Sequence, residues 1–371
     1  MKVQIVVTHL LGSGHLARAL NIAHAFNAAG HTAQVVSGGF PVHHLNNQDV
    51  HIVQLPALRS NGTDFTTLLS ASGAVATAAD FDDRLSQLIA AFDRFSPDVL
   101  ITELFPFGRR VLRNEFLALL KHAKSRAVCL SSVRDILAPP SKPQKAIWAA
   151  DVLKAHYTGV LVHSDQDLIP LDLSWPITSE TAPLLHYTGF VTQPLPPPSD
   201  LARDEILVSA GGGSVGDALF QAAIGASKTD KRTWRILVGG QNADARITKL
   251  RRLQGAALIE PARPDFRALL QGAAASISLC GYNTCMDILQ SSVPAVFVPF
   301  DEDGETEQGL RAQTLNGLPG LRVLPMGGLT ARTLQGELSD VLKDAKRLPI
   351  SSSDGAEKTV TIVERIFQAK Q

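Results

Sequence analysis

The sequence has few residues of several types and no excess of either charge. Among its 371 residues are three cysteines, three methionines, three tryptophans and three tyrosines, and 35 Lys and Arg balance 35 Asp and Glu. Proteins that follow the phosphates of a nucleic acid usually carry a basic excess or a basic stripe. The sequence has neither, so its composition argues against a nucleic-acid partner.

Long apolar runs are absent as well. No run approaches the ~20 residues that a helix needs to cross a bilayer, and the opening segment MKVQIVV turns polar at Thr8, too early for a secretory signal peptide. The three cysteines, Cys129, Cys280 and Cys285, lie in apolar segments without the spacing of metal ligands. Buried reduced thiols suit a cytoplasmic protein. We therefore expect a cytoplasmic location and no transmembrane segment, while peripheral membrane contact stays open.

Apolar residues are plentiful and make up 45% of the chain. With about 150 residues per domain, the length predicts two domains. In the first part, β-branched runs at residues 3–8, 33–37, 99–102 and 127–131 alternate with helix-period segments at residues 15–29, 81–95 and 109–124. Apolar strands separated by amphipathic helices predict parallel sheets covered on both faces, the doubly wound α/β architecture.

A proline-rich segment divides the chain. Residues 193–199 (QPLPPPS) contain four prolines, which favour a stiff extended connector and cannot occupy a central strand. Behind it the pattern restarts, with strands expected at residues 206–209, 235–238, 257–260, 275–279 and 295–299. We predict a Rossmann-like domain over residues 1–193, a linker over 194–200 and a second Rossmann-like domain over 201–355. A C-terminal helix within residues 356–371 could return to the first domain.

Each predicted domain opens with a strand, a glycine-rich turn and a helix. The first turn, Gly12-Ser13-Gly14, begins a G-x-G-x-x-A pattern, and residues 211–216 fit G-x-G-x-x-G. Glycines permit a tight turn and let a phosphate approach backbone N–H groups at the positive end of a helix. One such turn is weak support, because packing alone can require glycine there. Two turns that open two domains favour ligand binding.

A nicotinamide-dependent oxidoreductase would share these turns but needs an acidic residue at the end of the second strand. Here that strand ends in Ser37, Gly38 and Gly39, and the first acid that follows is Asp49. In the second domain, Asp230 precedes its strand instead of ending it. The sequence therefore disfavours NAD, and we expect no cofactor.

Further motifs resemble a known enzyme family. The segments GGSVG at 212–216, SLCGYNTCMD at 278–287 and VPF at 298–300, followed by Glu307, Gln308 and Arg311, resemble the C-terminal domain of family 28 glycosyltransferases. The segments GSGH at 12–15 and TELFPFGR at 102–109 resemble a bacterial group of predicted glycosyltransferases. The resemblance implies the GT-B fold, in which two Rossmann-like domains face each other across a cleft. It also implies a nucleotide-sugar donor in the C-terminal domain, an acceptor on the N-terminal side and no metal.

The resemblance also implies roles for individual donor-site residues. Gly213 and Ser214 would approach the diphosphate, Asp287 would hold the ribose, and Glu307 and Gln308 would read the hydroxyls of the donor sugar. The remaining donor-site candidates are Gly212, Gly216, Glu260, Phe266, Gly281, Asn283, Thr284 and Arg311. Phe266 could equally belong to the core. The peptidoglycan-precursor N-acetylglucosaminyltransferase, the type member of the family, has Glu where this chain has the shorter Asp287.

The acidic segment at residues 301–306 (DEDGET) contains a D-x-D pattern that could be mistaken for a metal clamp. That motif belongs at a strand end in a single-domain nucleotide fold, which nothing else in the sequence supports. A solvated acidic loop is the favoured interpretation, and we expect no bound metal.

Glycosyl transfer needs a base that takes the acceptor proton. We assign this role to His15, which follows the glycine turn at a helix N-terminus, where the helix dipole would keep the imidazole neutral. Glu103 ends a strand and should face the same crevice, where it could orient His15, hold an acceptor hydroxyl or cap a helix. Further acceptor-side candidates are Gly12, Ser13, Gly14, Arg109, Arg134 and Asp135. The two arginines suit an anionic acceptor or surface ion pairs equally well.

These features lead to one main functional hypothesis and two alternatives. The main hypothesis is an inverting, metal-independent glycosyltransferase that moves a sugar from a UDP-sugar or related donor to an unknown acceptor hydroxyl. Inversion follows from the resemblance, because one base and no nucleophilic carboxylate are expected. A nucleotide-sugar hydrolase or epimerase on the same scaffold is the enzymatic alternative. A non-catalytic protein that binds nucleotide-sugars is the other.

Overall fold

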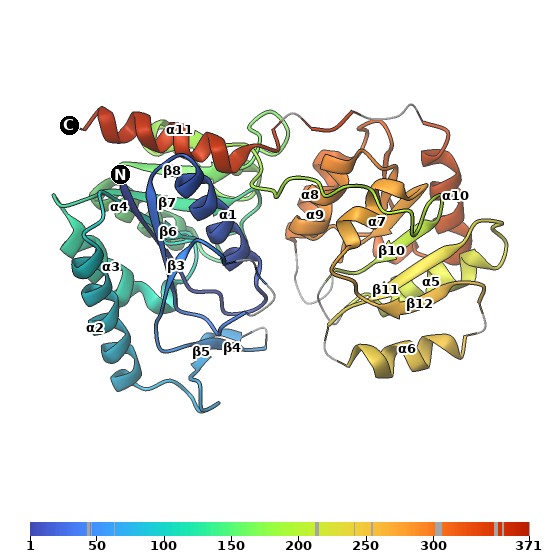
Figure 1. Ribbon diagram of the computed structural model, residues 1–371, viewed down its shortest axis with the longest axis horizontal. Helices are drawn as coiled ribbons and strands as arrows, with labels where there is room; N and C mark the ends of the chain where they lie inside the picture. Colours follow the sequence, from blue (N-terminus) through green and yellow to red (C-terminus); the bar gives the residue numbers. More distant parts are fainter. Residues whose placement is uncertain are drawn as a thin grey trace. The chain divides into compact units, whose positions relative to one another are not determined.

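The computed structural model describes residues 1–371 except 43, 44, 46, 63, 212–214, 241, 254, 301–305, 345–347, 351 and 371. The chain forms two compact units, which we call unit 1 (Met1–Thr192 with Ser352–Gln371) and unit 2 (Gln193–Ser351). Each unit contains a parallel sheet covered by helices (Figure 1). The predicted α/β class with doubly wound parallel sheets is confirmed.

The sheet of unit 1 has the strand order β3-β2-β1-β6-β7-β8-β9. These strands are β1 (Lys2–Val7), β2 (Thr32–Ser37), β3 (His51–Gln54), β6 (Val99–Glu103), β7 (Val128–Arg134), β8 (Gly159–His163) and β9 (Leu185–Tyr187). The helices are α1 (Gly14–Ala28), α2 (Ala78–Phe95), α3 (Arg113–Ala123), α4 (Pro143–His156) and α11 (Gly355–Gln368). A separate antiparallel hairpin joins β4 (Arg59–Asn61) to β5 (Asp64–Leu69).

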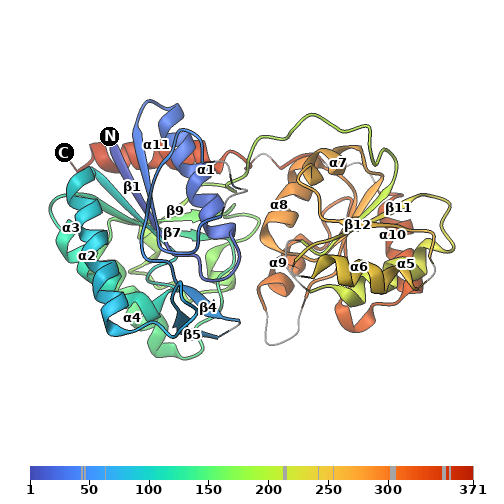
Figure 2. The ribbon, with the colours of Figure 1, turned by 60° about the horizontal axis from the view of Figure 1, so that its bottom comes forward.

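Alternation along β1 builds the core on both faces of this sheet. Val3, Ile5 and Val7 belong to the cluster beneath α1 and α11, whereas Val6 belongs to the cluster beneath α2, α3 and α4. Successive side chains of a strand point to opposite faces, so one apolar run can fill two cores. Figures 1 and 2 show α1 and α11 side by side on their face of the sheet.

The sheet of unit 2 has the order β12-β11-β10-β13-β14-β15. Its strands are β10 (Ile206–Ser209), β11 (Trp234–Val238), β12 (Leu258–Pro261), β13 (Ala275–Ser278), β14 (Ala295–Phe297) and β15 (Leu321–Val323). The helices are α5 (Asp217–Ser227), α6 (Ala243–Arg251), α7 (Phe266–Gly272), α8 (Tyr282–Ser291), α9 (Glu307–Leu315) and α10 (Ala331–Val341). A core cluster lies beneath α5, α6 and α10.

The predicted helix over residues 109–124 is wrong in its first turn. Arg109 has a φ of 56°, in the left-handed region, and a 3-10 turn, η1 (Arg110–Leu112), precedes α3. The strand predicted at 127–131 continues to Arg134, which brings Ser132 into the sheet. Further 3-10 turns are η2 (Leu171–Leu173), η3 (Ala182–Leu184) and η4 (Met326–Gly328).

Both sheets reverse their strand order beside the first strand of the unit. In unit 1 the reversal lies between β1 and β6, and in unit 2 it lies between β10 and β13. Ligands of open α/β sheets bind outside the carboxyl ends of the strands at such a switch point. Each unit therefore has one edge at which a site is expected. Among the described residues, no helix combines the length and apolar character needed to span a bilayer.

Candidate functional site

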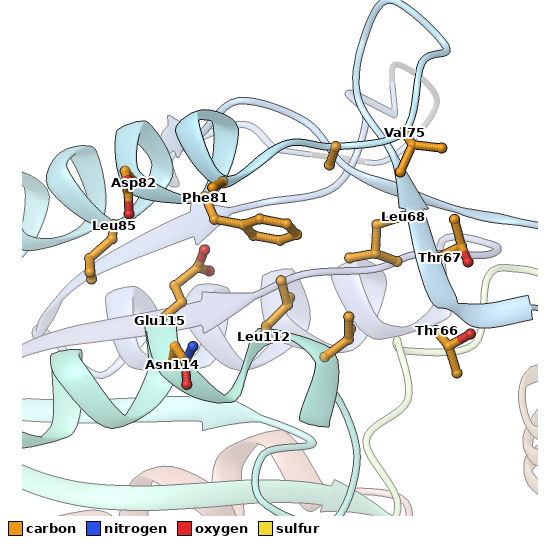
Figure 3. Close-up of a pocket in the computed structure, with 13 residues that line it drawn as sticks. Thr66, Thr67, Leu68, Val75, Phe81, Asp82, Leu85, Leu112, Asn114 and Glu115 are labelled. Atoms are coloured by element: carbon orange, nitrogen blue, oxygen red, sulfur yellow. The ribbon is translucent and has the colours of Figure 1, made fainter.

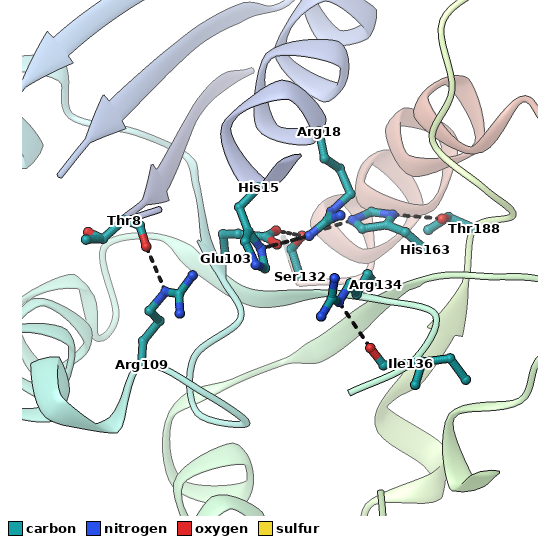
Figure 4. A network of polar contacts seen from close by, with 10 residues as sticks. All are labelled: Thr8, His15, Arg18, Glu103, Arg109, Ser132, Arg134, Ile136, His163 and Thr188. Carbon is teal, nitrogen blue, oxygen red and sulfur yellow. Dashed lines mark hydrogen bonds and ion pairs between the residues drawn. The ribbon is translucent and has the colours of Figure 1, made fainter. Parts of the chain in front are cut away.

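A buried carboxylate and an imidazole meet at the switch point of unit 1 (Figure 4). Glu103 is the last residue of β6, and His15 lies in the first turn of α1, directly after the β1 loop. His15 Nδ1 lies 2.8 Å from Glu103 Oε1, and the side chains are 14% and 2% exposed. No helix begins at Glu103, so the helix-cap interpretation is wrong for this residue.

Arg18, one turn further along α1, is the counter-charge of Glu103. Its guanidinium forms an ion pair with Glu103 Oε1, and its side chain is 4% exposed. Arg18 Nη2 also lies 3.1 Å from His15 Nδ1. Because Nδ1 cannot accept from Arg18 and donate to Glu103 together, and Arg18 is already paired with the carboxylate, we place the proton on Nδ1. His15 Nε2 then keeps its lone pair.

The second oxygen of Glu103 begins a buried chain of hydrogen bonds. Ser132 Oγ donates to Glu103 Oε2 over 2.6 Å and lies 2.9 Å from His163 Nε2. His163 Nδ1 lies 2.9 Å from Thr188 Oγ1. A neutral His163 with its proton on Nε2 satisfies both neighbours. Hydrogen bonds from two directions thus fix the Glu103 carboxylate against rotation.

The surroundings keep Glu103 ionised and His15 neutral. Burial opposes ionisation of Glu103, but the charge of Arg18 and the hydrogen bonds from His15 and Ser132 outweigh it and hold the pKa of this carboxyl well below its ordinary value. Burial lowers the pKa of His15 to about 3, against the hydrogen bond with Glu103, and the charges of Arg109 and Arg18 add to the decrease. This direction agrees with the predicted neutral imidazole, and burial is the largest cause of the decrease.

The acceptor-side candidates surround this edge of the sheet. Arg109 Nε donates to the Thr8 carbonyl over 2.7 Å at the end of β1, and burial lowers the pKa of Arg109 to about 10, so it remains a cation. Arg134 Nε donates to the Ile136 carbonyl over 3.1 Å, and Asp135 is fully buried. The N-terminus of α1 follows the glycine turn, with Gly12 at a φ of 67°, Ser13 as N-cap residue and Gly14 as first helical residue.

In unit 2, the glycine turn leads from β10 into α5. Gly212, Gly213 and Ser214 lie outside the described residues. Gly216 has a φ of 99°, and a Cβ there would lie 2.5 Å from the Cβ of Ala210, so both conformation and space require glycine. After the neighbouring strand β13, Gly281 precedes α8, whose first turn contains Asn283 and Thr284. Two helix N-termini, positive ends that favour anions, therefore lie at this switch point.

Asp287 on α8 forms an ion pair with Arg267 of α7. Arg267 Nε lies 2.8 Å from Asp287 Oδ1, and both side chains are about one-fifth exposed. Arg267 also donates to the carbonyls of Gln193 and Pro194, over 2.7 and 3.0 Å. Burial raises the pKa of Asp287 to about 6, although the charge of Arg267 opposes this increase. The arginine thus connects the proposed ribose carboxylate with the first residues of the proline-rich segment.

The remaining donor-site candidates divide into supporting and accessible residues. Arg311 is fully buried and donates to the Cys280 carbonyl over 2.8 Å, so it supports the loop before α8. Glu260 accepts from the buried Arg235 over 3.0 Å. Gln308 Oε1 accepts from the Phe300 N–H over 3.2 Å, and Glu307 begins α9. Phe266, the first residue of α7, is half-buried, which leaves both of its interpretations open.

No three His, Cys, Asp or Glu side chains come together as a metal site would require, as far as the described residues show. Asp301 and Asp303 lie outside those residues.

Sequence reasoning did not identify Arg18, Ser132 or His163. The apolar run Gly159–His163 was the available signal, because it predicts a strand with a histidine at its carboxyl end. Register then places Ser132 beside Glu103 on neighbouring strands. Arg18 gives no comparable signal, because its buried partner lies 85 residues away in the sequence.

Comparisons with known proteins agree with this architecture. Residues 207–366 match the family model described as the glycosyltransferase family 28 C-terminal domain. The calicheamicin glycosyltransferase CalG4 has a similar structure, with a TM-score of 0.67, 16% identity and coverage of 99% of this chain and 98% of that chain. MurG of Acinetobacter baumannii gives a TM-score of 0.61, 16% identity and coverage of 99% and 100%.

A third similar structure is UGT2 of Phytolacca americana, complexed with UDP-2-fluoro-glucose and pterostilbene. It gives a TM-score of 0.61, 14% identity and coverage of 99% of this chain and 100% of that chain. At these identities the likeness establishes the fold, and the predicted GT-B fold is confirmed. A search of curated proteins gave no match.

Proposed function

We propose that this chain is a glycosyltransferase that transfers a sugar from a UDP-sugar to an acceptor hydroxyl, with inversion and without a metal ion. The match of residues 207–366 to the family 28 C-terminal domain and the GT-B fold support this proposal. The observation that carries the proposal is the hydrogen bond between His15 Nδ1 and the ionised Glu103. It leaves Nε2 as a proton acceptor at the switch point of unit 1.

The reaction requires a single displacement. The acceptor oxygen forms a bond to the anomeric carbon while its proton passes to His15 Nε2, and the bond from that carbon to the diphosphate oxygen breaks. The leaving diphosphate takes the electron pair of the broken bond. Attack from the face opposite the leaving group inverts the anomeric configuration. Glu103 accepts from Nδ1–H throughout and stabilises the imidazolium that forms.

A base works best when its pKa lies near the working pH, and a pKa of about 3 is low for this role. An anion near an imidazole raises its pKa. We therefore expect the anionic donor to raise the pKa of His15, so that the base becomes effective when substrate is bound.

Unit 2 is proposed to hold the donor. The N-termini of α5 and α8 offer backbone N–H groups to the diphosphate, which makes a metal ion unnecessary in this scheme. Asp287 would accept from the ribose hydroxyls, and Glu307 and Gln308 would bind the donor sugar. UGT2, whose complex contains UDP-2-fluoro-glucose, supports the choice of a UDP-sugar. We further propose that the protein acts in the cytoplasm without a resident cofactor.

The test is incubation with a panel of UDP-sugars, with and without hydroxyl acceptors. We expect little free sugar without acceptor and a product of inverted anomeric configuration with it. Rapid release of free sugar, whether or not an acceptor is present, would identify a hydrolase instead. Binding of the nucleotide-sugar without any turnover would favour a non-catalytic protein.

A further inference from the structure

A pocket of about 500 Å³ lies in unit 1, and the proposed transfer mechanism does not use it (Figure 3). One wall is β5 with the turn that follows it, another is the first turns of α2, and the third is η1 with the start of α3. This volume lies within the range of about 300–1,000 Å³ that is typical of small-molecule sites.

Apolar side chains form the inner walls of the pocket. Leu68 and Leu112 are buried members of the core, and the half-buried Phe81 packs against the same core. Figure 3 shows the Phe81 ring extending from α2 into the space that faces Leu68. The position of α2 is fixed by a capping box, in which Thr77 and Asp80 bond to each other's backbone N–H. The ring therefore stands on a rigid helix start.

The charges around the pocket oppose an anionic ligand. Glu115 lies at its base, and Arg84 holds both of its oxygens, at 3.0 and 2.9 Å. Arg84 is completely buried and donates to the Gly38 carbonyl as well, so its charge is already compensated. Asp82 adds negative charge at the rim, and none of the described lining residues is Lys, Arg or His. A ligand carboxylate or phosphate would therefore meet no cation among the described lining residues.

The walls of the pocket are attached to the loop between β1 and α1, which leads directly to His15. The Ser60 N–H donates to the Leu10 carbonyl over 3.0 Å and fixes the hairpin to the loop between β1 and α1. On the other side, Arg109 bonds to Thr8 in this same loop, and η1 begins at the next residue. The pocket and the proposed base therefore belong to one edge of the unit 1 sheet.

We propose that this pocket binds the uncharged aromatic body of the acceptor, an aromatic alcohol whose hydroxyl receives the sugar. The assignment rests on the proposed glycosyl transfer. An aromatic body gains both burial of apolar area and ring contact with Phe81. Thr67 and Asn114, which lie around the pocket, can bond to further hydroxyls on such a body.

The binding test uses 2-naphthol, an uncharged aromatic alcohol, followed by its own fluorescence anisotropy without any donor. Val75 lines the pocket and is 59% exposed, so Val75→Trp places a large ring there without disturbing the core. Ile147→Trp on α4 is the matched control, because Ile147 is 60% exposed and is not a lining residue. Ala78→Trp, at the exposed start of α2, provides a second obstruction if the first variant folds poorly.

We expect saturable binding that Val75→Trp weakens more than tenfold and Ile147→Trp leaves unchanged. Competition with 2-naphthoate and 1-decanol tests which chemical class the pocket prefers. Both should displace 2-naphthol less well than other uncharged aromatic alcohols do. Absence of saturable binding, or equal loss in both tryptophan variants, would overturn the assignment. Stronger displacement by the carboxylate would replace it with an anion site, and stronger displacement by decanol would replace it with a chain-binding pocket.

Sugar transfer separates this inference from the proposed function. In the wild type, 2-naphthol should accept sugar, and Val75→Trp should raise the KM for 2-naphthol while leaving donor affinity unchanged. Transfer to other hydroxyls without 2-naphthol binding would refute the pocket alone. Pocket-dependent 2-naphthol binding without transfer to any hydroxyl would refute the proposed function and, with it, the acceptor role, leaving only an aromatic-binding site.

Discussion

His15 and His163 offer a matched test of the proposed base. Burial lowers the pKa of each imidazole to about 3, and each is connected to Glu103, His15 directly and His163 through Ser132. Only His15 keeps an Nε2 lone pair for an acceptor. We therefore expect His15→Gln to lower kcat by ~10²–10⁴-fold, the usual contribution of a general base. His163→Gln should lower kcat less than tenfold, because it disturbs only the support of Glu103.

The same pair predicts a common effect on stability. Each folded pKa lies below the ordinary value of 6.5, so the unfolded chain binds more protons between pH 6.5 and about 3. The free energy of unfolding therefore falls as the pH falls through this window. At 1.36 kcal/mol per pH unit below the unfolded pKa, each histidine lowers the free energy of unfolding by about 2 kcal/mol between pH 8 and pH 5. In each Gln variant, the free energy of unfolding should therefore fall by about 2 kcal/mol less between pH 8 and pH 5 than in the wild type.

Tryptophan positions make the measurement specific to unit 1. Trp148 and Trp175 lie in unit 1, and Trp234 is the tryptophan of unit 2. In a Trp234→Phe background, fluorescence during urea unfolding at pH 8 and pH 5 reports on unit 1. Turnover per folded molecule and calorimetric titration with donor complete the comparison, and donor affinity should stay unchanged in both variants.

Two results would refute the reasoning. Near-normal turnover by a folded His15→Gln variant would remove His15 from proton transfer and leave Glu103 as the next candidate. Equal loss of kcat in both variants would show that the two histidines support the fold of the site in the same way.

Three further predictions concern unit 2 and the donor. Asp287→Ala should weaken binding of a nucleoside diphosphate by about 1–3 kcal/mol in calorimetry. Because burial raises the pKa of Asp287 to about 6, the affinity of the wild type should decrease as the pH falls below 6, whereas the affinity of the variant should not. Turnover should survive EDTA, and a loss restored by manganese would bring Asp301 and Asp303 into the mechanism. Gly216→Ala should destabilise unit 2 by about 1–3 kcal/mol, because a Cβ would clash with Ala210. Trp234 fluorescence in urea, with Trp148 and Trp175 replaced by Phe, measures this change. An unchanged unfolding midpoint would contradict this last argument.

The main elements of the fold could be predicted because their signals are local. The β1 strand and α1 helix show clear period and length, and the glycine turn between them needs little context. The β4–β5 hairpin and α4 were not predicted, since their stability depends on packing against distant segments. Thus Ser60 of the hairpin is held by the Leu10 carbonyl, 50 residues away.

In the candidate site, too, residues with a local sequence signal could be predicted and residues that depend on distant partners could not. His15 and Glu103 could be proposed because each stands at the end of a recognisable strand or turn. The sequence also offered Glu103 as the residue that orients His15, and the two side chains do meet. The part of Arg18 could not be predicted, because its carboxylate partner lies far away in the sequence. A buried guanidinium becomes understandable only when β6 brings a carboxylate against it.

The course of the chain has a consequence for its synthesis on the ribosome. Unit 2 is inserted between two segments of unit 1. These two segments are joined by two hydrogen bonds: the Phe190 N–H donates to the Ser352 carbonyl over 2.7 Å, and the Gly355 N–H donates to the Phe190 carbonyl over 3.0 Å. A Cβ at Gly355 would lie 2.5 Å from the Gly189 carbonyl oxygen, so this junction tolerates no side chain. The apolar surface of α1 that α11 covers must therefore stay uncovered during translation until residues 355–368 emerge. Unit 2, whose residues are contiguous, can finish folding first. Unit 1 contains the residues that are synthesised first, but it can complete its fold only after the last helix has emerged.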